Sequence, residues 1–171
     1  MNDDADTEET VAPPRDARRA ARLAAVQALY QIEMNDAGAD EVIAEFVRHR
    51  LGADDDGSAS AAADPELFAD LVRGACARGD EIDALISRAL SANWTIDRLE
   101  LLLRAVLRVG VYELVGRPQV PVRVAINEHI EIAHDFFSRG EPGMVNGVLD
   151  RIARDVRAAE FADADDTDDT G

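Results

Sequence analysis

The feature that most constrains the fold is a long stretch that is apolar around almost the whole circumference of a helix. At helical spacing, one face carries Leu99, Leu102, Leu103, Val106, Val109 and Gly110. The remaining surface is largely covered by Leu101, Leu107, Val111 and Leu114. Such a helix is stable only where other helices cover it on several sides, so we expect it to be the central helix of an all-α fold. Charged residues interrupt the stretch, and we therefore expect no membrane span.

The rest of the chain supplies the helices that such a centre needs. Apolar residues at helical spacing predict helices in segments that contain residues 15–34, 40–51, 67–72, 82–90, 94–114, 121–133 and 145–156. Asp64-Pro65-Glu66 is typical of a helix start, because it offers a cap, a proline in the first turn and an acid at the positive end. We expect about seven helices in one compact domain, with two smaller bundles sharing the central helix.

The formal net charge of −17 is concentrated in three segments that contain no basic residue. We predict a disordered acidic arm at residues 1–14, a helical domain at 15–158 with an acidic loop at 53–64, and a disordered acidic tail at 159–171. Outside these acidic segments, acidic and basic residues nearly balance. The basic residues, all of them arginine, are therefore able to form a local patch.

Several classes of protein lack support in this sequence. It contains no P-loop, dinucleotide fingerprint or nucleophile elbow, so we predict that the chain is not an enzyme and uses no cofactor. Glu131 and His134 have the spacing of one half of a di-iron site, but no second Glu-x-x-His occurs, and no metal site is expected. Cys76 has no partner for an internal disulfide, and the acidic start lacks a secretory signal, so a cytoplasmic location is expected.

The strongest candidate for a binding site lies at the start of the first predicted helix. Helical spacing places Arg15, Arg18, Arg19 and Arg22 on one side, within about 10 Å along the axis. Clustered guanidinium groups are typical of sites for a phosphate backbone, which predicts binding of RNA or DNA. The alternative is a solvated face whose arginines pair with nearby acids such as Asp16 or with the acidic arm.

A second candidate is the glycine-rich junction at residues 139–147, which leads into the last predicted helix. Unpaired amides at a helix N-terminus favour anions, and we expect Asn146 and Gly147 in that first turn. The alternative is structural: Gly147 would permit close helix packing, and Asn146 would cap a neighbouring helix.

Several segments, taken together and in this order, resemble the NusB family of bacterial transcription antitermination proteins. They are RRAAR at 18–22 with AVQALY at 25–30, AVLRVGVYEL at 105–114, VPVRVAINE at 120–128 and VNGVLD at 145–150. The resemblance covers about residues 15–157 and implies two perpendicular helical bundles. It also implies binding to boxA, a short single-stranded element of ribosomal RNA leaders, as a heterodimer with the ribosomal protein NusE. The larger assembly would contain NusA, NusG and RNA polymerase.

The resemblance also implies roles for individual residues. In the family, the arginine-rich start contacts RNA, and the residue before Val145 is often an aromatic that touches RNA, preceded by a lysine. Those two positions are Met144 and Gly143 here. Tyr30 matches a position used against NusE, and Asp97 falls near an acidic position on that surface.

These arguments give one set of expected sites and one alternative function. The expected RNA-binding residues are Arg15, Arg18, Arg19, Arg22, Met144, Asn146 and Gly147, and the expected partner-binding residues are Tyr30 and Asp97. The alternative is a helical protein-interaction module or homodimer without direct RNA contact, because some relatives self-associate.

Overall fold

Helix α5 (Leu101–Gly116) lies at the centre of the structure, as its apolar surface requires. The computed structural model describes residues 15–52 and 62–165, and side chains up to residue 162. Around α5 lie α1 (Arg15–Asn35), α2 (Ala39–His49), α3 (Pro65–Ala77), α4 (Gly79–Ala89), a short 3-10 helix η1 (Ile96–Arg98), α6 (Val122–Phe136), α7 (Glu141–Val156) and α8 (Ala158–Asp165). No strand occurs in these residues, which confirms the all-α prediction.

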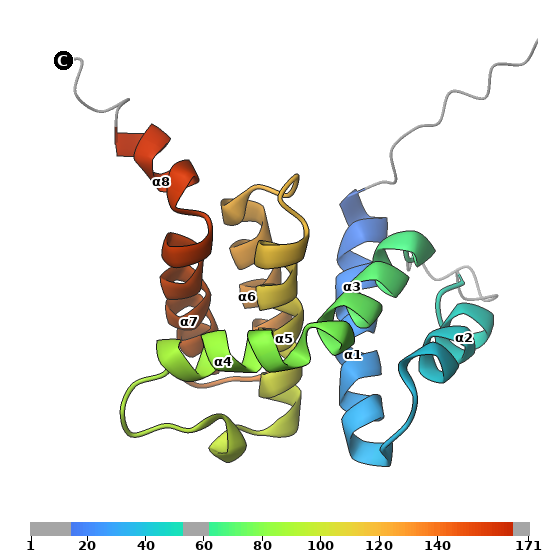
Figure 1. Ribbon diagram of the computed structural model, residues 1–171. Helices are drawn as coiled ribbons and strands as arrows, with labels where there is room; N and C mark the ends of the chain where they lie inside the picture. Colours follow the sequence, from blue (N-terminus) through green and yellow to red (C-terminus); the bar gives the residue numbers. More distant parts are fainter. Residues whose placement is uncertain (1–14, 53–61, 166–171) are drawn as a thin grey trace, which may run out of the picture.

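The helices form two small bundles that share α5 (Figure 1). Helices α1, α2 and α3 pack on one side of it, and α6 and α7 pack on the other. Helix α4 crosses α5 and reaches α7, so it connects the two sides. The core is continuous through both bundles, and the stacked rings of Phe46 and Phe68, 5.4 Å apart, join α2 to α3 within it. Within the described ranges, no helix is both long and apolar enough to cross a membrane.

The predicted helix starts are partly confirmed. The side chain of Asp64 accepts hydrogen bonds from the amides of Glu66 and Leu67, at 3.1 and 3.3 Å, as a cap should. The central helix, however, does not open at Trp94-Thr95. Residues 96–98 form η1, and Leu99 is extended, which turns its side chain into the core at 5% exposure.

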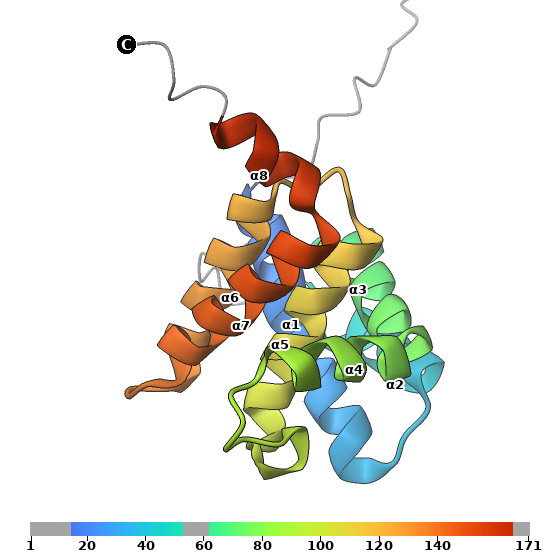
Figure 2. The same ribbon diagram turned by 60° about the vertical axis from the view of Figure 1, so that its left-hand side comes forward.

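The C-terminal segment corrects a second expectation. Residues 159–165, predicted as part of a disordered tail, belong to α8, which lies beside the start of α6 (Figures 1 and 2). A Glu160 oxygen accepts the Val122 amide at 3.1 Å, so a carboxylate sits at the positive end of α6. The Arg154 guanidinium lies 4.6 Å from the Phe161 ring centroid. The predicted arm at 1–14, most of the acidic loop and residues 166–171 lie outside the described residues.

Close approach between helices depends on two glycines that receive one tyrosine ring. A Cβ added at Gly74 of α3 would lie 1.9 Å from the ring of Tyr112, and one at Gly116 would lie 2.4 Å from it. The Tyr112 hydroxyl donates to Asp70 at 3.0 Å, so the ring has little freedom to move away. The slot between Gly74 and Gly116 therefore sets how closely α3 approaches α5.

Replacing Gly74 with alanine should destabilise the protein, because overpacking of this kind costs about 1–3 kcal/mol. The control is Gly147→Ala in α7, where an added Cβ meets nothing within 4 Å. Alanine is the better helix former there, and it should stabilise the protein by about 0.4–1 kcal/mol. Urea unfolding measures both changes, and equal effects would contradict the role of the slot.

Candidate nucleic-acid interface

The start of α1 presents exposed arginines next to α6. Arg15 and Arg18 are exposed, and neither makes an ion pair within the part of the chain that the structure describes. Asp16 lies in the same turn, where its negative charge stabilises the N-terminus of the helix. Two unpaired guanidinium groups in the first turn of a helix are chemically suited to phosphate oxygens.

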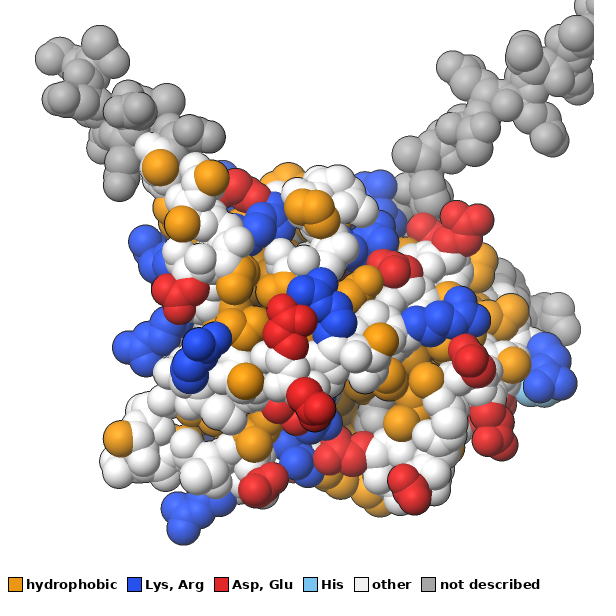
Figure 3. Space-filling model, viewed as in Figure 1, with side chains coloured by type: hydrophobic (Ala, Val, Ile, Leu, Met, Phe, Trp, Pro, Cys, Tyr) orange, Lys and Arg blue, Asp and Glu red, His pale blue; other side chains and the backbone are white. Residues whose placement is uncertain are grey.

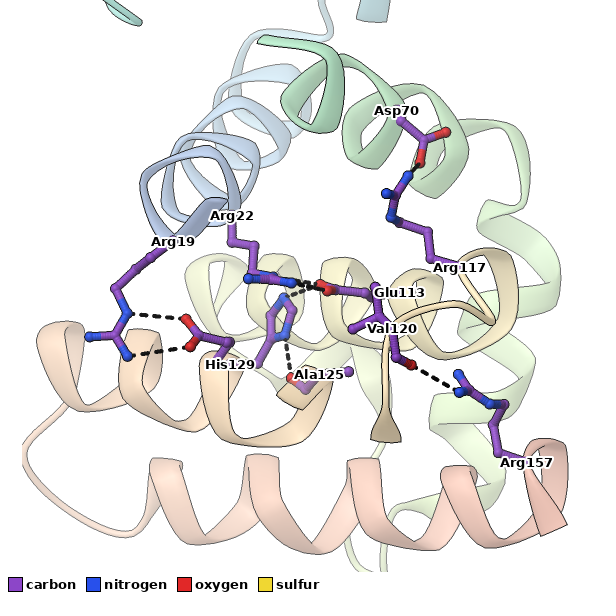
Figure 4. Close-up of polar contacts among 10 residues, drawn as sticks. Arg19, Arg22, Asp70, Glu113, Arg117, Val120, Ala125, His129 and Arg157 are labelled. Atoms are coloured by element: carbon purple, nitrogen blue, oxygen red, sulfur yellow. Dashed lines mark hydrogen bonds and ion pairs between the residues drawn. The ribbon is translucent and has the colours of Figure 1, made fainter. Parts of the chain in front are cut away.

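Arg19 is only partly available for a ligand. Its Nε and Nη2 donate to the Glu128 carboxylate of α6 at 3.1 and 3.4 Å (Figure 4). The Glu128 side chain is 6% exposed, whereas that of Arg19 is 48% exposed. This hydrogen bond, together with the carboxylate charge, raises the pKa of Arg19 above its ordinary value. Arg19 thus joins α1 to α6 and keeps one side of its guanidinium open.

Arg22 does not lie on the exposed surface, which corrects the sequence-based expectation. The residue is 4% exposed, and its Nε and Nη2 donate to the fully buried Glu113 carboxylate of α5 at 2.9 and 2.6 Å (Figure 4). Helical spacing predicts that these arginines share one side of α1, but spacing alone does not tell which of them turns inward. Arg22 fixes α1 against α5.

His129 of α6 lies beside this buried ion pair. Its Nδ1 donates to the Ala125 carbonyl at 2.8 Å, and its Nε2 faces the Glu113 carboxylate at 3.9 Å without a hydrogen bond. Burial lowers the pKa of His129 below its ordinary value and outweighs the opposing effect of Glu113. His129 is therefore neutral in the folded protein.

The α7 residues expected to bind RNA face two different hollows. Met144 and Gly147 line a hollow beside the end of α4, whereas Asn146 lines another between α6 and α8. Helix α7 begins at Glu141, so Asn146 and Gly147 lie beyond its first turn. The prediction that they lie among the unpaired amides of that turn, which favour anions, is therefore wrong. Gly147 is also not needed for helix packing, since nothing lies within 4 Å of an added Cβ.

The two expected partner-binding residues lie near the other end of α1. Tyr30 is 37% exposed and lines a hollow of about 740 Å³ with Met34, Leu102 and Phe136. Arg104 pairs with Glu33 of α1 at 2.9 Å and lies 4.0 Å from the Asp97 carboxylate. It therefore connects the end of α1, which carries Tyr30, to the segment that carries Asp97. Over the 15 residues between Arg15 and Tyr30, an α-helix rises about 22 Å.

Comparison with known proteins decides the family. The sequence profile of the NusB family matches residues 19–154. The transcription antitermination protein NusB of Nitrobacter hamburgensis is 47% identical over 158 residues, which cover 92% of this chain and 99% of that protein. The chain belongs to the NusB family. Among solved structures, T. maritima NusB has a TM-score of 0.70 at 33% identity, covering 85% of this chain and 96% of that one. A crystal structure of antitermination factors NusB and NusE in complex with dsRNA has a TM-score of 0.69 at 26% identity, covering 82% and 98%.

The structure of this NusB-family chain adds polar residues that sequence reasoning missed. Arg123 and Asn127 of α6 line the hollow of about 530 Å³ that also contains Asn146. Arg123 is exposed and makes no ion pair among the described residues. Both lie in the VPVRVAINE segment that carries the family resemblance, but only the fold shows that they face Asn146. No cluster of three His, Cys, Asp or Glu residues suited to a metal occurs in the described ranges.

Replacing Arg22 with methionine should destabilise the protein by about 3–5 kcal/mol, because Glu113 then keeps a buried charge without a partner. The matched control is Arg18→Met, an exposed position where a change within about 0.5 kcal/mol is expected. Adding Glu113→Leu to Arg22→Met should recover much of the loss. Chemical denaturation measures all three variants, and similar losses for Arg18→Met and Arg22→Met would contradict the buried pair.

His129 should make stability depend on pH. The unfolded chain protonates this side chain below about pH 6.5, whereas the folded chain resists protonation, so stability falls as the pH falls through that value. The difference in unfolding free energy between the original chain and a His129→Gln variant should therefore shrink between about pH 7 and pH 5. His134→Gln, at an exposed position, is the control and should keep the original pH dependence. A pH-independent difference for His129→Gln would contradict the assignment.

Proposed function

We propose that this chain is an RNA-binding transcription antitermination factor that acts together with a NusE-type ribosomal protein. The observation that carries the proposal is the match of nearly the whole helical chain to proteins of that name. A related structure that contains NusB, NusE and RNA supports binding of both partners by one fold. The role is one of binding rather than catalysis, and it would place the protein in the cytoplasm with NusA, NusG and RNA polymerase.

The exposed start of α1 supplies the electrostatic part of RNA binding in this proposal. Arg15, Arg18 and the open side of Arg19 contact phosphates, while Arg22 holds the helix that carries them. Met144, Asn146 and Gly147 provide contacts on α7, and α6 packs against both α7 and α1. Single-stranded RNA of the boxA type is the expected ligand, because exposed bases allow sequence to be read.

The opposite end of α1 supplies the protein contact. Tyr30 and its neighbours Met34 and Phe136 expose apolar surface around one hollow, and Asp97 adds a carboxylate whose side chain is 92% exposed. An aromatic anchor beside a hollow and a charged rim is the arrangement of many protein interfaces. We assign this surface to the ribosomal partner.

A second candidate function is a protein-interaction module or homodimer without RNA contact. The observation that favours it is the acidic surrounding of Arg19, where Glu128, Glu131 and Asp135 of α6 all raise its pKa. These carboxylates weaken the attraction for phosphate near the middle of the arginine cluster. The two functions differ in whether Arg15 and Arg18 matter for RNA.

Replacing Arg15 and Arg18 together with alanine should weaken binding of a boxA-like single strand by about tenfold at low salt. The slope of log K against log salt should fall in magnitude by about 1.4, since each lost phosphate contact removes about 0.7 for a single strand. Fluorescence anisotropy at two or more salt concentrations measures both quantities, with and without the ribosomal partner.

The matched control is a variant that removes charge elsewhere. Arg48 and Arg73 are exposed on α2 and α3 and lie in neither proposed RNA contact, so Arg48→Ala/Arg73→Ala changes the net charge equally. If the two double variants bind RNA alike, the α1 site is not specific. If the original chain binds no boxA-like strand while partner binding persists, the interaction-module function replaces the proposal.

A further inference from the structure

We propose that the hollow between the end of α4 and the side of α7 binds a single unpaired base of an RNA strand, with Trp94 as the stacking surface. The inference rests on the proposed function and names a contact for it. The hollow measures about 650 Å³, within the usual range for a small ligand site. Its wall includes the residues Ala89, Leu90, Ser91, Trp94, Met144 and Gly147.

Trp94 is placed as a platform rather than as a core residue. The residue is 46% exposed, although tryptophan is usually well buried. Its amide donates to the Ser91 carbonyl at 2.9 Å, which closes the turn that follows α4 and positions the side chain at the hollow. Met144, half-buried on α7, contributes a polarisable thioether to the same hollow. An aromatic face beside a soft apolar side chain suits a flat base.

Arginines beside the hollow supply the charge that a nucleotide needs. Arg151 lines it and is held in place by donation to the Ala89 carbonyl at 3.2 Å. A neighbouring hollow of about 380 Å³ shares Arg151 and adds Arg88, which has no ion pair among the described residues. In Figure 3, basic side chains gather along the left-hand edge of the molecule, where α4 ends and α7 lies in the same view of Figure 1.

The balance of charge favours RNA over an apolar peptide. Asp150 and Asp155 also line the hollow, but Asp150 already pairs with Arg154 at 3.0 Å. Arg88 and Arg151 therefore exceed the remaining acid, Asp155, and Arg151 lines the same hollow as Trp94. Met144 and Gly147, two of the α7 residues proposed to contact RNA, also form part of the wall of the hollow. One strand can thus reach both.

The experiment uses the intrinsic fluorescence of the full chain, because Trp94 is its only tryptophan. Addition of a short boxA-like single strand should quench the emission, with the same midpoint as binding followed by anisotropy of labelled RNA. A fully paired duplex of the same sequence should bind without comparable quenching, because its bases are already stacked. Trp94→Ala should weaken binding of the single strand by about tenfold, whereas Trp94→Phe should keep most of the affinity.

The outcomes separate this inference from the proposed function. Unchanged emission on RNA binding, together with unchanged affinity of Trp94→Ala, overturns the base site. In that case a loss of affinity in Arg15→Ala/Arg18→Ala leaves the proposed function standing, whereas an original chain that binds no boxA-like strand removes both. Emission that responds to the ribosomal partner but not to RNA also overturns the base site and assigns the hollow to protein.

Discussion

The arrangement of the molecule depends on the buried ion pair between Arg22 and Glu113. Two charges removed from water cost free energy, and only their short, two-pronged hydrogen bonds offset that cost. The pair therefore requires one relative placement of α1 and α5, and His129 fills the space beside it as a neutral ring. The direction in which the first turn of α1 points, and with it the position of Arg15 and Arg18, follows from that placement.

Much of the fold could be predicted from the sequence, because apolar spacing is a local signal. The all-round apolar character of α5 identified the centre, and the Asp64 cap and Pro65 located the start of α3. Helix α8 was missed because its acids resemble a tail. What orders it is the contact of Glu160 with the start of α6 and of Phe161 with Arg154. The contact of Glu160 spans 38 residues of sequence, and composition carries no sign of either contact.

The candidate site was predicted only in part, for the same reason. Four arginines at helical spacing look equivalent in the sequence, yet Glu128 engages Arg19 and Glu113, 91 residues away, buries Arg22. Likewise, Met144 and Asn146 are two residues apart but face different hollows, because α7 packs against α4 on one side and α6 on another. Residue types can be assigned from a local pattern, but the direction of each side chain depends on which helices pack beside it.

Helix α1 is fastened at both ends, which has a consequence for assembly. Near its start it is held by Glu113 and Glu128, and near its end Glu33 receives both Arg104 and Arg108. Held in this way, α1 keeps a fixed distance between a ligand bound at its start and a ligand bound at its end. If both ligands also touch each other, occupancy of one raises the local concentration of the second at its tip. Such cooperative assembly needs no conformational change. It needs only a protein partner at the end of α1 that extends along the helix far enough to contact the RNA strand bound at its start.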